Sequence, residues 1–203
     1  MKNLFALSIL AASVAMTACS KKPEETTPAT GAAATTASAS GSTIIKIGHA
    51  APLTGPQAHL GKDNENGVRL AVDELNAKGL TIGGQKVQFE LHSEDDQADP
   101  RIATTVAQKF VDDKVNVMIG HLNSGTTIPA SRIYNDAGIV EISPSATNPK
   151  YTQQGYKGAF RVMANDVQQG KVLGEFAVND MAAKKIAIID DRSAYGQGLA
   201  DEF

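Results

Sequence analysis

The sequence predicts an α/β fold built on a parallel sheet, and three observations support this prediction. Short apolar runs alternate with segments of helical periodicity in the order β-α-β-α-β-α-β, which is typical of parallel strands joined by right-handed crossovers with helices on both faces. Two of the apolar runs lead directly into turns rich in hydroxyl side chains. The composition is globular: of 203 residues, 20% are charged and 42% hydrophobic, and the net charge of -3 gives no basic excess for nucleic acid.

The first nineteen residues are predicted to be a signal peptide. Lys2 precedes the apolar run Leu4–Ala15, which is too short to span a bilayer as a permanent helix. The following Met16-Thr17-Ala18-Cys19 resembles a bacterial lipoprotein signal, in which a small residue precedes a lipid-modified cysteine. We therefore predict lipidation at Cys19, with an ordinary secretory signal as the alternative, and export in either case.

Residues 20–43 are predicted to form a flexible linker. They consist of Ala, Ser, Thr, Gly and Pro with four early charges, and they contain no aromatic or large aliphatic residue. Such a segment cannot bury a core. It suits a tether between an anchored Cys19 and a folded domain.

The first elements of the folded part are predicted from periodicity. Thr43–Gly48 is an apolar strand, and a helical pattern runs from Gly61 to Gly79. One stripe of this helix holds Val68, Ala71, Val72 and Leu75. Lys86–Leu91 alternates as a strand.

A second helix is predicted after the acidic loop that follows this strand. Asp99 is placed to cap it and Pro100 to occupy its first position. Its buried stripe consists of Ile102, Val106 and Phe110, and it leads into a strand at residues 115–119.

The stretch from Gly120 to Pro149 is predicted to form half of a small-molecule site. A hydroxyl-rich turn at residues 123–127 follows the strand, a helix runs to Asp136, and a short strand at 139–142 leads into a second hydroxyl-rich turn at 143–147. In an open parallel sheet both turns lie at the carboxyl ends of strands, where such sheets bind ligands.

Beyond Pro149 the pattern predicts one further unit. Residues 151–156 are expected to be loop, and 159–162 a short extended piece. A helix from Gln168 to Ala182 is predicted to bury Val172, Phe176 and Met181. Lys184–Asp190 is predicted to be a buried strand, followed by the first turns of another helix.

Three blocks of the sequence closely resemble the branched-chain amino acid binding proteins of bacterial ABC importers. The blocks are Gly61–Gly79, Gly120–Tyr156 and Ile186–Phe203, and the resemblance extends over Ile44–Phe203. It implies the type I periplasmic binding protein fold, in which two Rossmann-like lobes with parallel sheets enclose a ligand cleft. By the same resemblance we expect lobe 1 at 44–165, the start of lobe 2 at 166–203, and a chain truncated at its C-terminus.

The resemblance also implies a set of ligand contacts. Ser124, Ser145 and Thr147 would hold the charged ends of an amino acid, with Thr126 and Thr127 nearby. Tyr195 matches a lobe 2 tyrosine that closes over the ligand, although it is equally compatible with packing on its own lobe. Leu60 lies at the cleft mouth, where relatives often have an aromatic ring. His121, beside the first turn, is predicted to line the site.

Physical chemistry agrees with this assignment. Ser124 is expected at the start of a helix, where free N–H groups and the helix dipole favour an anion. Its alternative role is that of a simple helix cap, and one residue can do both. Hydroxyl groups both donate to a carboxylate and accept from an ammonium group. No Arg or Lys lies between Gly120 and Pro129, which suits a ligand with balanced charges better than a phosphate.

Other chemistry is disfavoured by the sequence. Some relatives carry a lobe 1 disulfide, but the matching positions are Ala98 and Asn123. The four histidines lack metal-binding spacing, and the acidic loop at 94–99 lacks EF-hand spacing. There is no Walker A motif, and Ser124 lacks the GxSxG context of a hydrolase. No metal, cofactor or enzymatic activity is therefore expected.

The sequence thus predicts a periplasmic receptor that delivers branched-chain or related amino acids to an ABC permease. The alternative is a receptor of the same fold for amides or aromatic acids, acting in sensing or uptake. The protein is expected to be a monomer that contacts the membrane only through a lipid anchor at Cys19.

Overall fold

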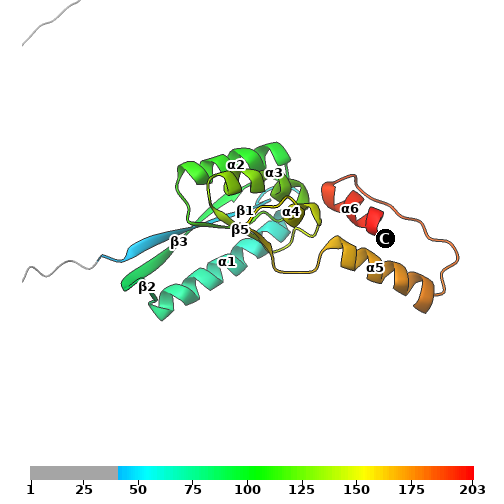
Figure 1. Ribbon diagram of the computed structural model, residues 1–203, viewed down its shortest axis with the longest axis horizontal. Coiled ribbons are helices and arrows are strands. Elements are labelled where there is room, and N and C mark those ends of the chain that lie inside the picture. The colour runs from blue at the N-terminus through cyan, green and yellow to red at the C-terminus, as the bar shows by residue number, and fades with distance from the viewer. Residues whose placement is uncertain (1–40) are drawn as a thin grey trace, which may run out of the picture. The chain divides into compact units, whose positions relative to one another are not determined.

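A computed structural model describes residues 41–203 and contains one six-stranded sheet (Figure 1). Its strands are β1 (Thr43–Ala51), β2 (Thr81–Ile82), β3 (Gln85–Asp95), β4 (Val117–Gly120), β5 (Val140–Ser143) and β6 (Ala159–Arg161). Their order across the sheet is β2-β3-β1-β4-β5-β6. All neighbouring pairs are parallel except the short hairpin of β2 with β3. The predicted parallel α/β fold is confirmed.

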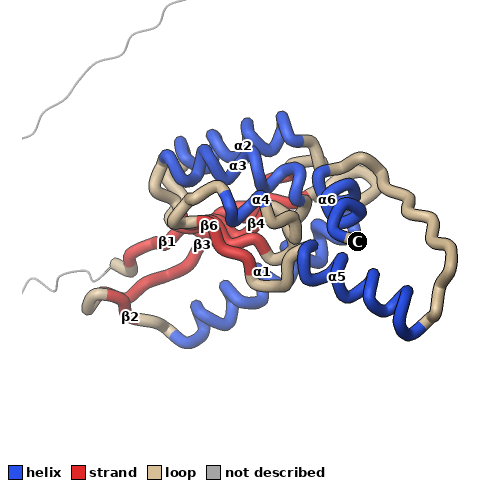
Figure 2. The backbone as a smooth tube through the Cα atoms, turned by 45° about the vertical axis from the view of Figure 1, so that its right-hand side comes forward, coloured by secondary structure: helices blue, strands red, loops and turns tan. Residues whose placement is uncertain are grey.

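Helices cover both faces of the sheet, as the alternating pattern predicts, and the described residues form seven helical segments. They are α1 (Ala58–Lys78), α2 (Pro100–Asp112), α3 (Ser124–Asp136), α4 (Lys150–Gln153), α5 (Asp166–Glu175), the π-helical turn η1 (Phe176–Asp180) and α6 (Ala194–Glu202). Both views place α2 and α3 on one face and α1 on the other (Figures 1 and 2). No helix within residues 41–203 combines the length and apolar character needed to cross a membrane.

The main core lies between the sheet and the pair α2 and α3. Its buried side chains come from β1, β4, both helices and the ends of the connecting loops. They are Ala50, Val106, Ala107, Phe110, Val115, Met118, Ala130, Tyr134 and Ile139. The predicted stripe of α2 is confirmed at Val106 and Phe110, which are buried. Ile102 is partly buried and packs against the same cluster.

The start of α2 follows the predicted capping pattern. The Asp99 side chain accepts hydrogen bonds from the backbone N–H groups of Arg101 and Ile102, and Pro100 occupies the first turn. These bonds satisfy donors that the first turn of a helix leaves free. The stripe predicted on α1 is less complete, because Val72 is buried whereas Ala71 is exposed.

The predictions for Tyr151 and for residues 184–190 are wrong. Tyr151 lies in α4 and is fully buried rather than in a loop. Lys184–Asp190 is not a strand, and Ile186, Ile188 and Ile189 are exposed. A strand needs hydrogen-bonding neighbours, and no other strand of residues 41–203 pairs with this run.

The helix before that run also differs from its prediction. It begins at Asp166 and changes to π-helical geometry at Phe176. Val172, Phe176 and Met181, predicted to be buried, are about half exposed or more. The described residues therefore cover only part of their apolar surfaces.

The predictions for the signal peptide, the Cys19 lipid site and most of the linker fall outside the described residues. Of the linker, only residues 41–43 are described, and Thr43 already belongs to β1.

Candidate functional site

Two loops meet at the carboxyl edge of the sheet. The first turn (residues 121–124) joins β4 to α3, and the second turn (residues 144–147) follows β5. Gly120 ends β4 with φ of 140°, and a Cβ there would approach the carbonyl oxygen of Ala50 to 2.5 Å. Only glycine fits this position without strain. The close approach brings the first turn over the end of β1.

Hydroxyl side chains connect the two turns to each other. The Ser143 hydroxyl donates to the carbonyl of His121 at 2.8 Å, and the Ser145 hydroxyl donates to the carbonyl of Leu122 at 2.8 Å. The Ser124 hydroxyl accepts from the backbone N–H of Asn148 at 3.2 Å. The two turns therefore form one hydrogen-bonded unit.

A cavity of about 530 Å³ opens at this unit. Its lining comes from the two turns, the start of α1, the loop before α2, and the segment leading into α6. The lining residues are Gln57, Leu60, Ala98, Pro100, Leu122, Asn123, Ser124, Gly125, Ser145, Thr147, Asp191, Ser193 and Tyr195. Five residues predicted from the sequence thus lie on one cavity: Leu60, Ser124, Ser145, Thr147 and Tyr195.

The other three predicted residues lie outside its lining. Thr126 and Thr127 are fully buried, and their hydroxyl groups donate to the backbone carbonyl of Asn123. The His121 ring is also fully buried, between Asp96 and Tyr134. Thr126 and Thr127 lie in the first turn of α3, whereas His121 precedes the helix, and all three side chains make their hydrogen bonds inside the fold rather than at the cavity.

Ser124 is the first residue of α3, and Asn123 is its N-cap. The alternative in which Ser124 itself caps the helix therefore does not hold. The Asn123 side chain makes no cap hydrogen bond and instead donates to the Gln57 side chain at 2.8 Å. The N–H group of Thr126 bonds to the Asn123 carbonyl at 3.1 Å, whereas Ser124 and Gly125, the first two residues of α3, line the cavity, where the start of a helix leaves its N–H groups free. Together with the helix dipole they favour a negative group there.

Thr147 lies between the cavity and a buried carboxyl group. Its hydroxyl oxygen is buried and has no hydrogen bond of good geometry among residues 41–203, and the same holds for both carboxylate oxygens of Asp166. Burial raises the pKa of Asp166, and the nearby Thr147 hydroxyl and Arg161 lower it in part.

Four polar residues of the cavity were not predicted as ligand contacts: Gln57, Asn123, Asp191 and Ser193. Asp191 and Ser193 follow an apolar run and precede a helix, as Ser124 does. That shared pattern is the signal that could have identified them. Asp191 is the one charged side chain among the described residues that line the cavity, and Ser193 caps α6 by accepting from the Gly196 N–H at 2.9 Å.

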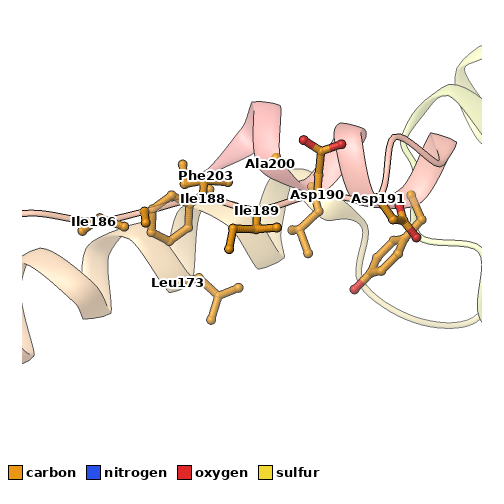
Figure 3. A pocket seen from close by; sticks show the side chains of 12 residues that line it. Leu173, Ile186, Ile188, Ile189, Asp190, Asp191, Ala200 and Phe203 are labelled. Atoms are coloured by element: carbon orange, nitrogen blue, oxygen red, sulfur yellow. The ribbon is translucent and has the colours of Figure 1, made fainter.

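A second cavity, of about 500 Å³, lies beside α5, the extended segment 186–191 and α6 (Figure 3). Aliphatic and aromatic side chains form most of its lining, among them Leu173, Ile186, Ile188 and Phe203. It lacks the converging hydroxyl and N–H groups of the first cavity. We therefore regard the cavity at the two turns as the candidate site.

The arrangement at the first cavity is suited to non-covalent binding. It offers hydroxyl groups, a helix N-terminus and an aromatic ring, and the described chain has no group of three or more His, Cys, Asp or Glu side chains placed to hold a metal ion. A parallel sheet with such a cavity at its carboxyl edge is the architecture of an α/β ligand-binding protein.

Comparison with known proteins gives the family. A family model described as "Periplasmic binding protein" matches residues 44–203. The chain therefore belongs to the periplasmic binding protein family.

Among relatives, it is 46% identical over 158 residues to Leu/Ile/Val-binding protein homolog 1 of Brucella abortus (strain 2308), covering 78% of this chain and 42% of the relative. It is 42% identical over 156 residues to the leucine-specific-binding protein of Salmonella typhimurium, covering 77% of this chain and 42% of the relative. The chain thus spans less than half the length of these relatives.

Solved structures agree with the fold. The branched-chain amino acid transporter substrate-binding protein LivJ of Streptococcus pneumoniae, in complex with isoleucine, superposes with a TM-score of 0.72 at 33% identity, covering 79% of this chain and 45% of that one. The leucine-binding protein LivK of Thermotoga maritima gives a TM-score of 0.71 at 28% identity, covering 78% and 44%.

Proposed function

We propose that this protein is a solute-binding receptor of an ABC importer, and that it binds leucine, isoleucine, valine or a closely related amino acid. The observation that carries the proposal is the position of Ser124, Ser145 and Thr147 on one cavity wall, at the carboxyl edge of the sheet. We call these three residues the clamp. Tyr195 and Asp191 contribute to the same cavity from the segment around α6.

The clamp suits the carboxylate of an amino acid. Ser124 begins α3, so the backbone donors of the first helical turn and the positive end of the helix dipole are directed at this wall. The Thr147 hydroxyl of the second turn adds a donor at the same place, while the Ser145 hydroxyl, which donates to Leu122, offers an acceptor oxygen. No cationic side chain lines the cavity among the described residues, which favours a ligand that brings its own positive charge over a dianion.

The ammonium group and the side chain of the ligand have partners on the other walls. Hydroxyl oxygens accept from an ammonium group, and the carboxylate of Asp191 supplies the negative charge of the lining. Leu60, Ala98, Pro100 and Leu122 provide apolar surface. A branched aliphatic side chain fits such a surface because it gains free energy on leaving water.

The comparisons support the same ligand class. Curated relatives at 42% to 46% identity are named for binding leucine, isoleucine and valine, and a solved relative at 33% identity contains isoleucine. These names describe the relatives, and we extend them to this chain as a proposal.

We further propose that the protein is exported, carries a lipid at Cys19, and acts as a monomer that delivers its ligand to a membrane permease without catalysing a reaction. The proposal rests on the lipoprotein-like sequence around Cys19 and on the family. Metabolic labelling with a radioactive fatty acid tests the anchor. Label should enter the wild-type protein and be absent from Cys19→Ser; equal label in both would contradict the assignment.

The ligand proposal is tested by calorimetry on the full-length protein. Leucine should bind, whereas 4-methylpentanoate, which lacks the ammonium group, and leucinamide, which lacks the carboxylate, should bind at least about tenfold more weakly, since each loses a charge-assisted hydrogen bond. Amides and aromatic acids are screened in parallel. If one of those classes binds and no amino acid does, the amino-acid proposal is wrong.

A further inference from the structure

A chain of three fully buried polar side chains lies behind the first turn. His121 Nδ1 and Asp96 Oδ2 are 2.7 Å apart, and His121 Nε2 and the Tyr134 hydroxyl are 3.1 Å apart. All three side chains have an exposed fraction of 0%. Because a carboxylate oxygen only accepts, the Nδ1–H group of His121 is the donor of the hydrogen bond to Asp96.

These residues come from three different segments. Asp96 belongs to the loop between β3 and α2, His121 to the first turn, and Tyr134 to the last part of α3. Asp96 is itself fixed in two ways: its Oδ1 accepts from the N–H of Ala98 at 3.0 Å, and its own N–H donates to the carbonyl of Ala51 at 3.1 Å. The His121 ring is thus held at both nitrogens by groups that are anchored elsewhere.

The backbone of the same residue serves the clamp. The His121 carbonyl accepts from the hydroxyl groups of Thr127, at 3.1 Å, and Ser143, at 2.8 Å. Ser143 in turn accepts from the N–H of Ala146, at 3.0 Å, inside the second turn. The next carbonyl, that of Leu122, accepts from the Ser145 hydroxyl at 2.8 Å.

We propose that Asp96, His121 and Tyr134 form a positioning network for the clamp. By fixing the His121 ring, the network fixes the peptide groups of His121 and Leu122, and these carbonyls hold the second turn against the start of α3. The three residues do not line the cavity, so they act on a ligand through Ser124, Ser145 and Thr147. The expected effect of the network on ligand binding rests on the proposed function. Its expected effect on the order of the two turns does not.

The buried state of the network makes it sensitive to single changes. Burial raises the pKa of the Tyr134 hydroxyl well above its usual value, so that the hydroxyl keeps its proton at neutral pH. A buried hydrogen-bonding group that loses its partner carries its full desolvation cost. Removing one member therefore favours a rearrangement of the first turn in which the remaining groups reach other partners.

Two near-isosteric variants test the network. Tyr134→Phe removes the hydroxyl group and keeps the ring. In the wild-type protein the two carboxylate oxygens of Asp96 accept separately from the His121 ring and from the backbone N–H of Ala98. Asp96→Asn leaves a single acceptor oxygen for these two donors. Val106→Ala is the matched control. Val106 lies on α2 and is buried in the same core. Its truncation should lower stability without removing a hydrogen bond to either turn.

The first readout needs no ligand. Amide hydrogen exchange is measured at Ala146 and Asn148, whose N–H groups bond to Ser143 and Ser124, with each network variant compared with Val106→Ala at equal distance below its melting temperature. Exchange should be about threefold to tenfold faster in the network variants, corresponding to the loss of one hydrogen bond. Exchange that matches the control at both amides overturns the inference, whether or not the protein binds an amino acid.

The second readout is the dissociation constant for leucine in calorimetry. It should rise about threefold to tenfold in Tyr134→Phe and Asp96→Asn and stay within about twofold of wild type in Val106→Ala. If the wild-type protein binds leucine and the network variants bind it equally well, the positioning role is wrong. If the wild-type protein binds no amino acid, the proposed function fails, and the exchange experiment alone decides the inference.

A spectroscopic measurement separates a positioning role from simple packing. With ¹⁵N-labelled histidine, Nδ1 of His121 should give the signal of a protonated nitrogen in the wild-type protein and in Val106→Ala. In Asp96→Asn that signal should shift, because its acceptor has changed. An unchanged signal would mean that Asp96 does not hold the ring.

Discussion

The side-chain amide of Asn148 donates a hydrogen bond of 2.7 Å to the backbone carbonyl of Ala194. This contact joins the residue after the second turn to the start of α6, one position before Tyr195. Asn148 is almost completely buried, and its backbone N–H bonds to Ser124. One residue therefore connects the clamp to the segment that carries the aromatic wall of the cavity.

We expect Asn148→Ala to weaken leucine binding about threefold to tenfold, since it removes one buried hydrogen bond from the support of Tyr195. Calorimetry measures the effect. Gln154→Ala is the control, because the Gln154 side chain also donates to buried groups, Ser131 and the Tyr151 carbonyl, but lies outside the cavity lining. Equal losses in both variants would show that Asn148 matters only for general stability.

Ser145→Ala is expected to weaken leucine binding about tenfold, because it removes both a clamp hydroxyl and the hydrogen bond to Leu122. Ser131→Ala serves for comparison. Its hydroxyl donates to Ile128 at 2.7 Å within α3 and does not line the cavity, so affinity should stay within about twofold. Titration of leucine into each variant gives the answer, and unchanged affinity in Ser145→Ala would remove Ser145 from the clamp.

Substitution by alanine should change the free energy of unfolding in opposite directions at Gly61 and Gly67 on α1. A Cβ at Gly61 would overlap the backbone carbonyl of Pro52, whereas one at Gly67 meets nothing within 4 Å. We expect Gly61→Ala to lower the free energy of unfolding by about 1–3 kcal/mol through overpacking. Gly67→Ala should raise it by about 0.5–1 kcal/mol through helix propensity.

Urea unfolding at one pH measures both variants. If Gly61→Ala is as stable as Gly67→Ala, the close approach of α1 to the loop after β1 is not as described.

Glu141 should make the stability of the protein depend on pH. Its carboxyl group is buried on β5, and neither oxygen has a hydrogen-bond partner among residues 41–203. Burial raises its pKa well above the ordinary value of 4.5. The folded state therefore holds a proton that the unfolded state releases above about pH 4.5, so this group destabilises the fold progressively as pH rises toward the folded pKa.

We accordingly expect Glu141→Gln to remove part of this pH dependence. The difference in unfolding free energy between Glu141→Gln and the wild-type protein should move in favour of the variant between pH 4.5 and 7, by up to about 1.4 kcal/mol per pH unit. Urea titrations at several pH values measure it. A difference that stays constant over this range would mean that Glu141 is ionised in the folded protein.

The sheet and one wall of the site could be predicted from local sequence patterns. The β4–α3–β5 unit was predictable because apolar runs, hydroxyl-rich turns and a glycine stop follow one another within thirty residues. The positions of Ser124, Ser145 and Thr147 at one edge then follow from the parallel topology. Leu60 and Tyr195 depended on the family resemblance.

The remaining features depend on contacts between distant residues. His121 and Asp96 are 25 positions apart, and no local pattern indicates that the ring turns into the core. Lys184–Asp190 has the composition of a strand, but its backbone finds no strand partner among residues 41–203. Composition states a preference, whereas pairing decides the structure.

Leu60 has a spectroscopic consequence. It lines the cavity from α1 with 46% of its surface exposed, and the 203 residues contain no tryptophan. In Leu60→Trp, the indole would be the one tryptophan among these 203 residues. Its emission wavelength would report the polarity of the cavity mouth without any attached dye, so that occupancy of the cavity could be followed optically in real time.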